Sequence, residues 1–108
     1  MIITPSSSVA GHRVARTCGL VKGSTIRARH VGKDILAVFK NVIGGEIEEY
    51  TKMMAEAREQ AIDRMVADAK ALGGNAIIDM RFSTSYMMSA ASEIMAYGTA
   101  VVIEKDGN

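Results

Sequence analysis

The pattern of apolar positions in residues 46–72 predicts one long helix. Apolar residues recur there every three or four positions, which places them on one stripe, and the intervening residues are mostly strong helix formers. Glycine pairs, Gly44-Gly45 and Gly73-Gly74, flank the stretch, as is typical of helix termini. At about 1.5 Å per residue this helix is roughly 40 Å long, more than the diameter of about 26 Å expected for a domain of this length. One chain covers such a helix only if its strands are equally long.

Strand patterns predominate before this helix. Residues 1–4 suggest a short edge strand. Residues 9–30 are β-branched and small and are interrupted by glycines, which predicts a long strand or a hairpin bent at the glycines. Residues 33–43 place their apolar side chains on one helical face, which predicts a first, short helix directly before the long one.

The pattern changes to alternation after the long helix. Residues 75–82 alternate, which predicts a strand with one wet face that carries Asn75, Asp79 and Arg81. The residues expected on its apolar face are Ala76, Ile78, Met80 and Phe82. Residues 83–92 are small and polar around a few larger residues, which predicts a hairpin connection. Residues 93–104 then predict a last strand.

The last strand has two apolar faces of different size. Ala96, Gly98 and Ala100 lie on the small face, and small residues let a helix approach closely. We therefore expect the Ala57 and Ala61 side of the long helix to cover this face. The larger face is then left over, and an uncovered apolar strand face implies a partner, most simply another copy of the chain. Its residues are Met95, Tyr97, Thr99, Val101 and Ile103.

These elements predict a single α+β domain over residues 1–108, with an antiparallel sheet backed by one short and one long helix. The chain of 108 residues is 48% hydrophobic, which is enough for one core with little to spare. The net charge is +1 and the basic residues are scattered, so we expect neither nucleic acid nor a membrane as a partner. No secretory signal or membrane-spanning run is recognisable, which gives the cytoplasm as the expected location.

Candidate catalytic and metal-binding residues are few. Cys18 is the only cysteine, so the sequence has no disulfide framework and no zinc-type cysteine spacing. Other soft donors do not have metal-ligand spacing; they are His12, His30, Met53-Met54 and Met87-Met88. The serines of residues 83–89 lack a nearby His and Asp, and the glycine segments do not match phosphate-loop motifs. A binding module is therefore favoured over the alternative, a small enzyme with a site between the long helix and the sheet.

Arg58 is unusual because it falls inside the apolar stripe of the long helix. Its neighbours three and four residues away include no acid, so a partner must come from elsewhere. Asp34, Glu93, a backbone carbonyl or an acid of a neighbouring subunit are candidates for a buried pair. Alternatively, Arg58 lines a polar pocket and holds an anionic ligand, or its side chain extends to solvent at the edge of the stripe.

Three segments in order, GGEIEEYTKMMAEAREQAIDRM, ALGGNAIIDMRFSTS and EIMAYGTAVVI, resemble the YbjQ-like family of small bacterial and archaeal proteins. The resemblance covers nearly the whole chain. It implies a dodecin-subunit-like two-layer protomer, assembly into a homopentameric ring, and a label of heavy-metal binding. We expect heavy-metal or small-ligand binding at subunit junctions, and the cofactor stays open, with a divalent heavy metal as one candidate. No catalytic residues and no metal ligands follow from the resemblance.

The resemblance also indicates which residues to consider as ligand-binding. Arg58, Glu46, Tyr50 and Arg81 all stand at positions that match the family pattern. Cys18 does not belong to that pattern, and we expect it to be structural and not a required metal ligand.

Overall fold

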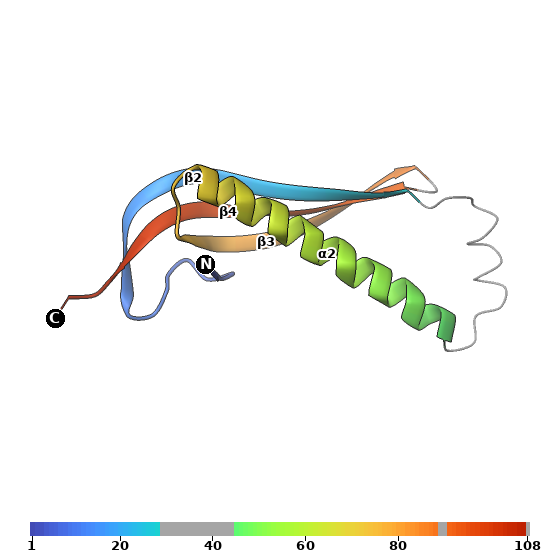
Figure 1. Ribbon diagram of the computed structural model, residues 1–108, viewed down its shortest axis with the longest axis horizontal. Coiled ribbons are helices and arrows are strands. Elements are labelled where there is room, and N and C mark those ends of the chain that lie inside the picture. Colours follow the sequence, from blue (N-terminus) through green and yellow to red (C-terminus); the bar gives the residue numbers. More distant parts are fainter. Residues whose placement is uncertain (29–44, 89–90, 108) are drawn as a thin grey trace.

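A long helix lies along one face of a four-stranded sheet in the computed structural model, which describes residues 1–28, 45–88 and 91–107 (Figure 1). In chain order the elements are β1 (Ile2–Ile3), β2 (His12–Ala28), α2 (Gly45–Ala71), β3 (Ala76–Met88) and β4 (Ala91–Lys105). The α+β class and the long helix are confirmed, and the short helix predicted over residues 33–43 lies outside the described residues. No helix in the described ranges is long and apolar enough to cross a membrane.

The sheet has the strand order β1-β3-β4-β2 and is mixed. Its three long strands are antiparallel, as predicted, because β4 pairs with β3 on one side and with β2 on the other. β1 is parallel to β3, so the prediction of a fully antiparallel sheet is wrong at this edge. The reason is the connection between β1 and β2, which crosses from one edge of the sheet to the other and leaves both strands running the same way.

β2 is one continuous strand of 17 residues and not a hairpin. It pairs with β4 over its whole length, from His12 opposite Lys105 to Ala28 opposite Ala91. The glycine bend appears as an irregularity within the strand, where the register shifts between Thr17 and Gly19 and Gly19 has a φ of 132°. Long strands thus provide the surface that the long helix requires.

β3 extends well past the end that the sequence predicts. Ser83 and Ser85, expected in a hairpin connection, pair with Met95 and Glu93 of β4. Strand preference depends strongly on pairing context, and the hydrogen bonds to β4 override the weak local preference of these serines. The predicted connection over residues 83–92 is therefore wrong, since the strand continues to Met88.

A bulge in β3 exchanges the faces of its residues. The register shifts between Ile78 and Arg81, and Asp79 within the bulge has a φ of 54°. As a result Ile78 packs on the far side of the sheet, whereas Met80, two residues later, packs against the core beneath α2. The single apolar face predicted for residues 75–82 is wrong for this reason, because simple alternation does not survive an inserted residue.

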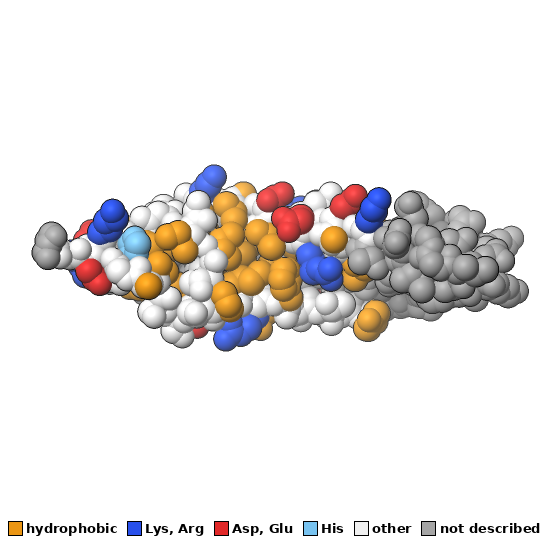
Figure 2. Space-filling view, turned by 90° about the horizontal axis from the view of Figure 1, so that it is seen from below, with side chains coloured by type: hydrophobic (Ala, Val, Ile, Leu, Met, Phe, Trp, Pro, Cys, Tyr) orange, Lys and Arg blue, Asp and Glu red, His pale blue; other side chains and the backbone are white. Residues whose placement is uncertain are grey.

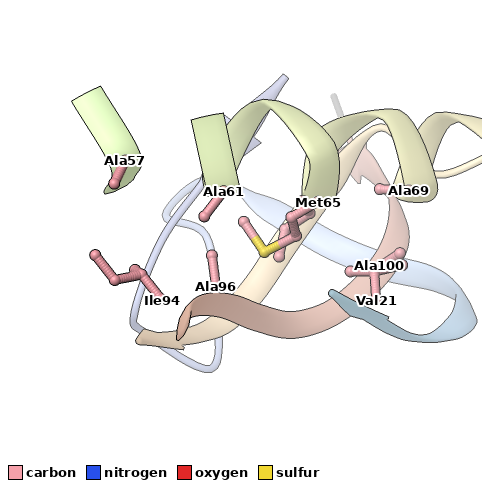
Figure 3. Packing of buried hydrophobic residues seen from close by; sticks show 9 residues of the cluster. Val21, Ala57, Ala61, Met65, Ala69, Ile94, Ala96 and Ala100 are labelled. Carbon is pink, nitrogen blue, oxygen red and sulfur yellow. The ribbon is translucent and has the colours of Figure 1, made fainter. Parts of the chain in front are cut away.

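The main core lies between α2 and the strands β2 and β4 (Figure 3). The alanines at positions 57 and 61 are fully buried in one cluster with Ala96 and Ala100 of the small face, so the long helix covers this face as predicted. Met65 packs in the same cluster as these alanines and is also fully buried. The remaining members of this cluster are Val21, Ala69, Ile77 and Ile94.

α2 comes closest to the sheet at Gly23 of β2. A Cβ atom at this position would overlap the carbonyl oxygen of Ala61 and the amide nitrogen of Met65. Two polar side chains of α2 also bind the outer edge of β2: Arg64 donates to the carbonyl of Ser24 at 2.5 Å, and the amide of Lys22 donates to Asp68 at 3.2 Å. The helix therefore covers both the face and the edge of β2.

Glycine ends α2 in the way that the sequence indicates. Gly73 has a φ of 83°, its amide donates to Lys70, and the amide of Gly74 donates to Ala69, both at 3.0 Å. This is the Schellman arrangement, in which a left-handed glycine satisfies the last carbonyls of a helix. Asn75 follows, and its side chain exchanges two hydrogen bonds with the backbone of Ile103. The corner between α2 and β3 is therefore fixed to β4.

The face of the sheet turned away from α2, here called the far face, is only partly covered. Val101 is 1% exposed and Ile103 is 8% exposed, because they pack with Ala76, Ile78 and Val9 of the N-terminal segment. The prediction that this whole face is left over is wrong at this end. On β2, which lies at the edge of the sheet beside β4, Leu20 is 68% exposed and Ile26 is 57% exposed on the same face.

The molecule is elongated. Its radius of gyration is 17.7 Å, against about 13 Å for a compact domain of this length. Figure 1 shows the N-terminal half of α2 diverging from the sheet, and Figure 2 shows apolar side chains gathered across the middle of the face seen from below. Several apolar residues beside the core are only partly buried: Ile3, Met54, Ile62, Val66 and Met80. A single chain thus leaves part of its apolar surface uncovered.

Gly23→Ala should destabilise the protein by about 1–3 kcal/mol or more, because the added methyl group must displace the backbone of α2. Chemical denaturation of this variant measures the effect. Gly107→Ala is the control, since a Cβ there meets nothing within 4 Å and should change the free energy of unfolding little. Equal stability of the two variants would contradict the close approach at Gly23.

Candidate functional site

A row of three residues crosses the far face of the sheet. Arg81 of β3 pairs with Tyr97 of β4, which pairs with Lys22 of β2. Paired residues lie on the same face of a sheet, and neighbouring strands are about 4.8 Å apart. The backbones of Arg81 and Lys22 therefore lie on either side of Tyr97, about 10 Å from each other. Arg81 and Lys22 are exposed and Tyr97 is half-buried. This row is the candidate binding site.

The bulge in β3 positions Arg81. The backbone of Asp79 is in the left-handed region, which aspartate tolerates better than most residues, and the hydroxyl of Ser7 donates to its carboxylate at 2.6 Å. The amide of Asp79 donates to the carbonyl of Ser6 at 3.0 Å. The guanidinium of Arg81 donates to the carbonyls of Pro5 and Met80, both at 2.8 Å. The N-terminal segment therefore fixes the bulge and the first residue of the row.

Gly98 makes room for this bulge from the neighbouring strand. A Cβ atom at Gly98 would lie 2.8 Å from Cγ2 of Ile77 and 2.9 Å from the carbonyl oxygen of Ile78. Tyr97 directly precedes Gly98, so the close approach at this glycine also affects the position of Tyr97 opposite Arg81. A larger residue here would disturb the core and the row together.

Apolar residues surround the row on the far face. Leu20 lies opposite Thr99, and Ile26 lies opposite Glu93, so both point to the side of Lys22. Met95 and Thr99 of β4 are half-buried between them. Exposed apolar residues mark interaction surfaces, and ligand sites are mostly apolar with a few polar groups that orient the ligand.

The structure does not bring the four predicted ligand-binding residues together in one chain. Arg81 is on the far face, whereas Arg58 is on α2 at the other side of the sheet, with an exposed side chain. Glu46 and Tyr50 belong to the first turns of α2, and their side chains lie outside the described part of the structure. Of the two whose side chains the structure describes, Arg81 lies at the candidate site and Arg58 does not.

The buried pair considered for Arg58 is not present in the described chain. Its side chain is exposed, which agrees with the alternative that it extends to solvent. Glu93 cannot reach it because it lies on the far face, paired with Ser85, and Asp34 lies outside the described residues. Arg58 is exposed although the adjacent Ala57 is fully buried, because Arg58 shares the neighbouring row of the helix with Ile62 and Val66, which are only partly buried.

The His, Cys, Asp and Glu side chains of the described residues do not gather into a metal site. In residues 1–28, 45–88 and 91–107, no group of three or more His, Cys, Asp or Glu side chains could hold one. Cys18 packs half-buried against the main core, and His12 lies six residues earlier on β2, roughly 20 Å along the strand. Met54 packs against the same core as Cys18. The side chains of His30 and of Met87-Met88 lie outside the description.

Sequence reasoning missed Lys22 and did not connect Tyr97 with Arg81. Treating β2 as one straight strand would have found Lys22, because alternate residues of a strand lie on one face. On β2 these residues are Leu20, Lys22, Ser24 and Ile26. The bulge that aligns Arg81 with Tyr97 has a weaker signal, an aspartate within an apolar strand.

Comparisons with known proteins agree on one family. A family model with the description "Putative heavy-metal-binding" (YbjQ) matches residues 1–104. A UPF0145 protein of Dehalococcoides mccartyi strain BAV1 is 61% identical over 104 residues, which are 96% of this chain and 100% of that protein. A UPF0145 protein of Clostridioides difficile is 53% identical over 108 residues, which cover 100% of this chain and 96% of that protein, and an archaeal one, of Methanosarcina acetivorans, is 52% identical over 103 residues, 95% of this chain and 97% of that protein.

The fold also occurs in a solved structure. The crystal structure of a DUF74 family protein of unknown function from Pediococcus pentosaceus superposes with a TM-score of 0.64 at 18% sequence identity, over 96% of this chain and 98% of that chain. At this identity the likeness concerns the fold alone.

Arg58→Met should change the free energy of unfolding by less than about 0.5 kcal/mol, because the side chain is exposed and makes no ion pair in the described chain. Arg64→Met on the same helix is the matched comparison and should cost about 1 kcal/mol, since it removes the hydrogen bond to Ser24. Thermal or urea denaturation measures both. A loss of several kcal/mol for Arg58→Met would indicate a buried acid left unpaired, contrary to this structure.

Proposed function

The chain belongs to the YbjQ family, and we propose that it is an oligomeric binding module whose sites form at the junctions between subunits. The observation that supports this most is the far face of the sheet, where the row of Arg81, Tyr97 and Lys22 lies beside exposed apolar residues. A neighbouring subunit placed on this face would cover the apolar residues and enclose the row. Binding, and not catalysis, is the function that these residues support.

Assembly is supported by the surface that one chain leaves uncovered. Leu20 and Ile26 are 68% and 57% exposed, and the elongated shape leaves other apolar residues half-buried. Burying one leucine or isoleucine side chain contributes about 1.5–3 kcal/mol, which favours association of copies through this face. The assembly that we propose is a closed ring of identical subunits, with five as the count that the resemblance to the family implies.

The ligand that the described residues suit best is a small molecule with an anionic group. Lys22 and Arg81 place two positive charges on either side of the Tyr97 ring, and a planar guanidinium binds carboxylate or phosphate groups in two-point geometry. Enclosure by a second subunit would strengthen this attraction by excluding water.

A divalent heavy metal is the second candidate ligand, favoured by the family description "Putative heavy-metal-binding". Because one described chain gathers no set of three donors, a metal site would need donors from more than one subunit. The two candidates differ in charge, so they respond in opposite ways to the loss of Lys22 and Arg81.

Native mass spectrometry of the purified protein tests the proposal because it reports subunit count and bound mass together. We expect a closed oligomer of the 11.6 kDa chain with a bound small molecule. The double variant Lys22→Gln, Arg81→Gln should lose that mass, since it removes both cations of the row. Cys18→Ala is the control and should keep subunit count, bound mass and metal content.

Three results would contradict parts of this account. A monomer at micromolar concentration would contradict assembly. A bound mass that survives in the double variant would contradict the row as the site. A stoichiometric metal that disappears in Cys18→Ala would show that the thiolate is a required ligand and that an anion is not the cargo.

A further inference from the structure

The far face carries a carboxylate as well as the two cations of the row. Glu93 lies on β4 opposite Ser85, four residues before Tyr97, so it belongs to the same face as the row. Glu93 is half-buried. Among the described residues the structure has one ion pair, between Arg13 and Glu104 toward the opposite end of β4. In that part of the chain Glu93 therefore has no counter-charge.

The register of the strands sets the distance between Glu93 and the row. Between Tyr97 and Glu93, neither β3 nor β2 shifts in register against β4. At a rise of about 3.4 Å per residue, the step of four residues along β4 is about 14 Å. Side chains of strands lean along the strand direction, so Arg81 and Lys22 can bring their charges to roughly 10 Å from the carboxylate. The far face thus holds two positive charges at one end and a negative charge at the other.

The residues between the two ends are uncharged. Ser83 of β3 and Ser24 of β2 lie on either side of Met95 of β4, in the next row along the sheet. All three are half-buried. A serine hydroxyl both donates and accepts hydrogen bonds, and a methionine side chain adapts to apolar groups of different shape. These residues suit the uncharged middle of an elongated ligand.

We propose that the site binds an elongated zwitterion, with the acid group of the ligand at Arg81 and Lys22 and its ammonium group at Glu93. The inference rests on the proposed function, because the acid group occupies the row assigned there to an anionic ligand. Charge complementarity supports the ammonium end. A ligand with an acid group alone would leave the carboxylate of Glu93 without a counter-charge in a site closed to water, which costs free energy.

The distance between the two ends selects the length of the ligand. A free amino acid carries its two charges too close together to reach both ends. Three residues of extended peptide span at most about 10–11 Å, so the two termini of a tripeptide can contact both ends at once. Its peptide groups then lie over Ser83 and Ser24, which can exchange hydrogen bonds with them. A short peptide is therefore the zwitterion that these residues suit best.

Isothermal titration calorimetry of the purified full-length protein with trialanine tests the proposal. N-acetyl-trialanine lacks the ammonium group, and trialanine amide lacks the carboxylate. We expect trialanine to bind about tenfold more tightly than either capped peptide, because each cap removes a charge-assisted contact. Equal affinities of trialanine and N-acetyl-trialanine would overturn the proposal.

Glu93→Gln tests the ammonium end because it keeps the size of the side chain and removes its charge. It should weaken the binding of trialanine about tenfold and leave that of N-acetyl-trialanine unchanged. Glu104→Gln is the matched control, since Glu104 also lies on β4 but pairs with Arg13 outside the site. This variant should leave both affinities unchanged. An unchanged affinity for trialanine in Glu93→Gln would contradict the assignment of Glu93.

The double variant Lys22→Gln, Arg81→Gln separates this inference from the proposed function. If it weakens the binding of both peptides while Glu93→Gln weakens neither, the row binds anions and the zwitterion is wrong. If it weakens neither peptide, the row is not the site and both proposals are overturned. If neither peptide binds the unmodified protein, the zwitterion is wrong, and the bound mass seen by native mass spectrometry still decides the proposed function.

Aminooctanoate distinguishes the two sources of such a ligand, a short peptide and a long-chain amino acid. It has a similar span to trialanine but no peptide groups for the serines to bind. Tighter binding of trialanine would support a peptide. Tighter binding of aminooctanoate, with the same loss in Glu93→Gln, would support the zwitterion and overturn the peptide as its source.

Discussion

The close contact between α2 and the strands β2 and β4 determines the rest of the architecture. It depends on Gly23, where no side chain separates the backbones, and on the buried alanines on both sides of the contact. Because the helix lies over β2 and β4, it leaves the same face of β3 largely open, and with it the aromatic residues Phe82 and Tyr86. The close approach at Gly23 and the alanines therefore leaves Phe82 and Tyr86 of β3 exposed to a partner.

The far face of the sheet is covered by less of the chain than the face that carries α2. The N-terminal segment packs there with the cluster that holds Val101 and Ile103, so the exposed Leu20 and Ile26 of β2 depend on contacts outside the chain. The row of Arg81, Tyr97 and Lys22 meets β2 between Leu20 and Ile26. Binding and assembly are therefore coupled in this account, because the subunit that covers Leu20 and Ile26 also encloses the row.

Local patterns were sufficient for some elements and not for others. The spacing of apolar residues predicted α2 and its alanine contact with the last strand, because both follow from one stripe and one small face. The bulge at Asp79 and the extension of β3 through Ser85 were not predictable, since they depend on pairing with β4, far away in the sequence. The candidate site shows the same division. Arg81 came from the family resemblance, and Lys22 was missed because the glycines left a hairpin as an alternative to one strand. Arg58 was placed inside the apolar stripe, but it lies beside the buried row that begins at Ala57.

The central claim is that other copies of the chain cover the far face, and hydroxyl-radical footprinting of the unmodified protein tests it most directly. In one chain Leu20 is 68% exposed and Leu72, at the end of α2, is 43% exposed, so an isolated chain should be labelled more at Leu20 than at Leu72. The account predicts the reverse at the working concentration of the assembled protein, with Leu20 labelled no more than the buried residues of the core. Labelling of Leu20 above that of Leu72 would contradict it.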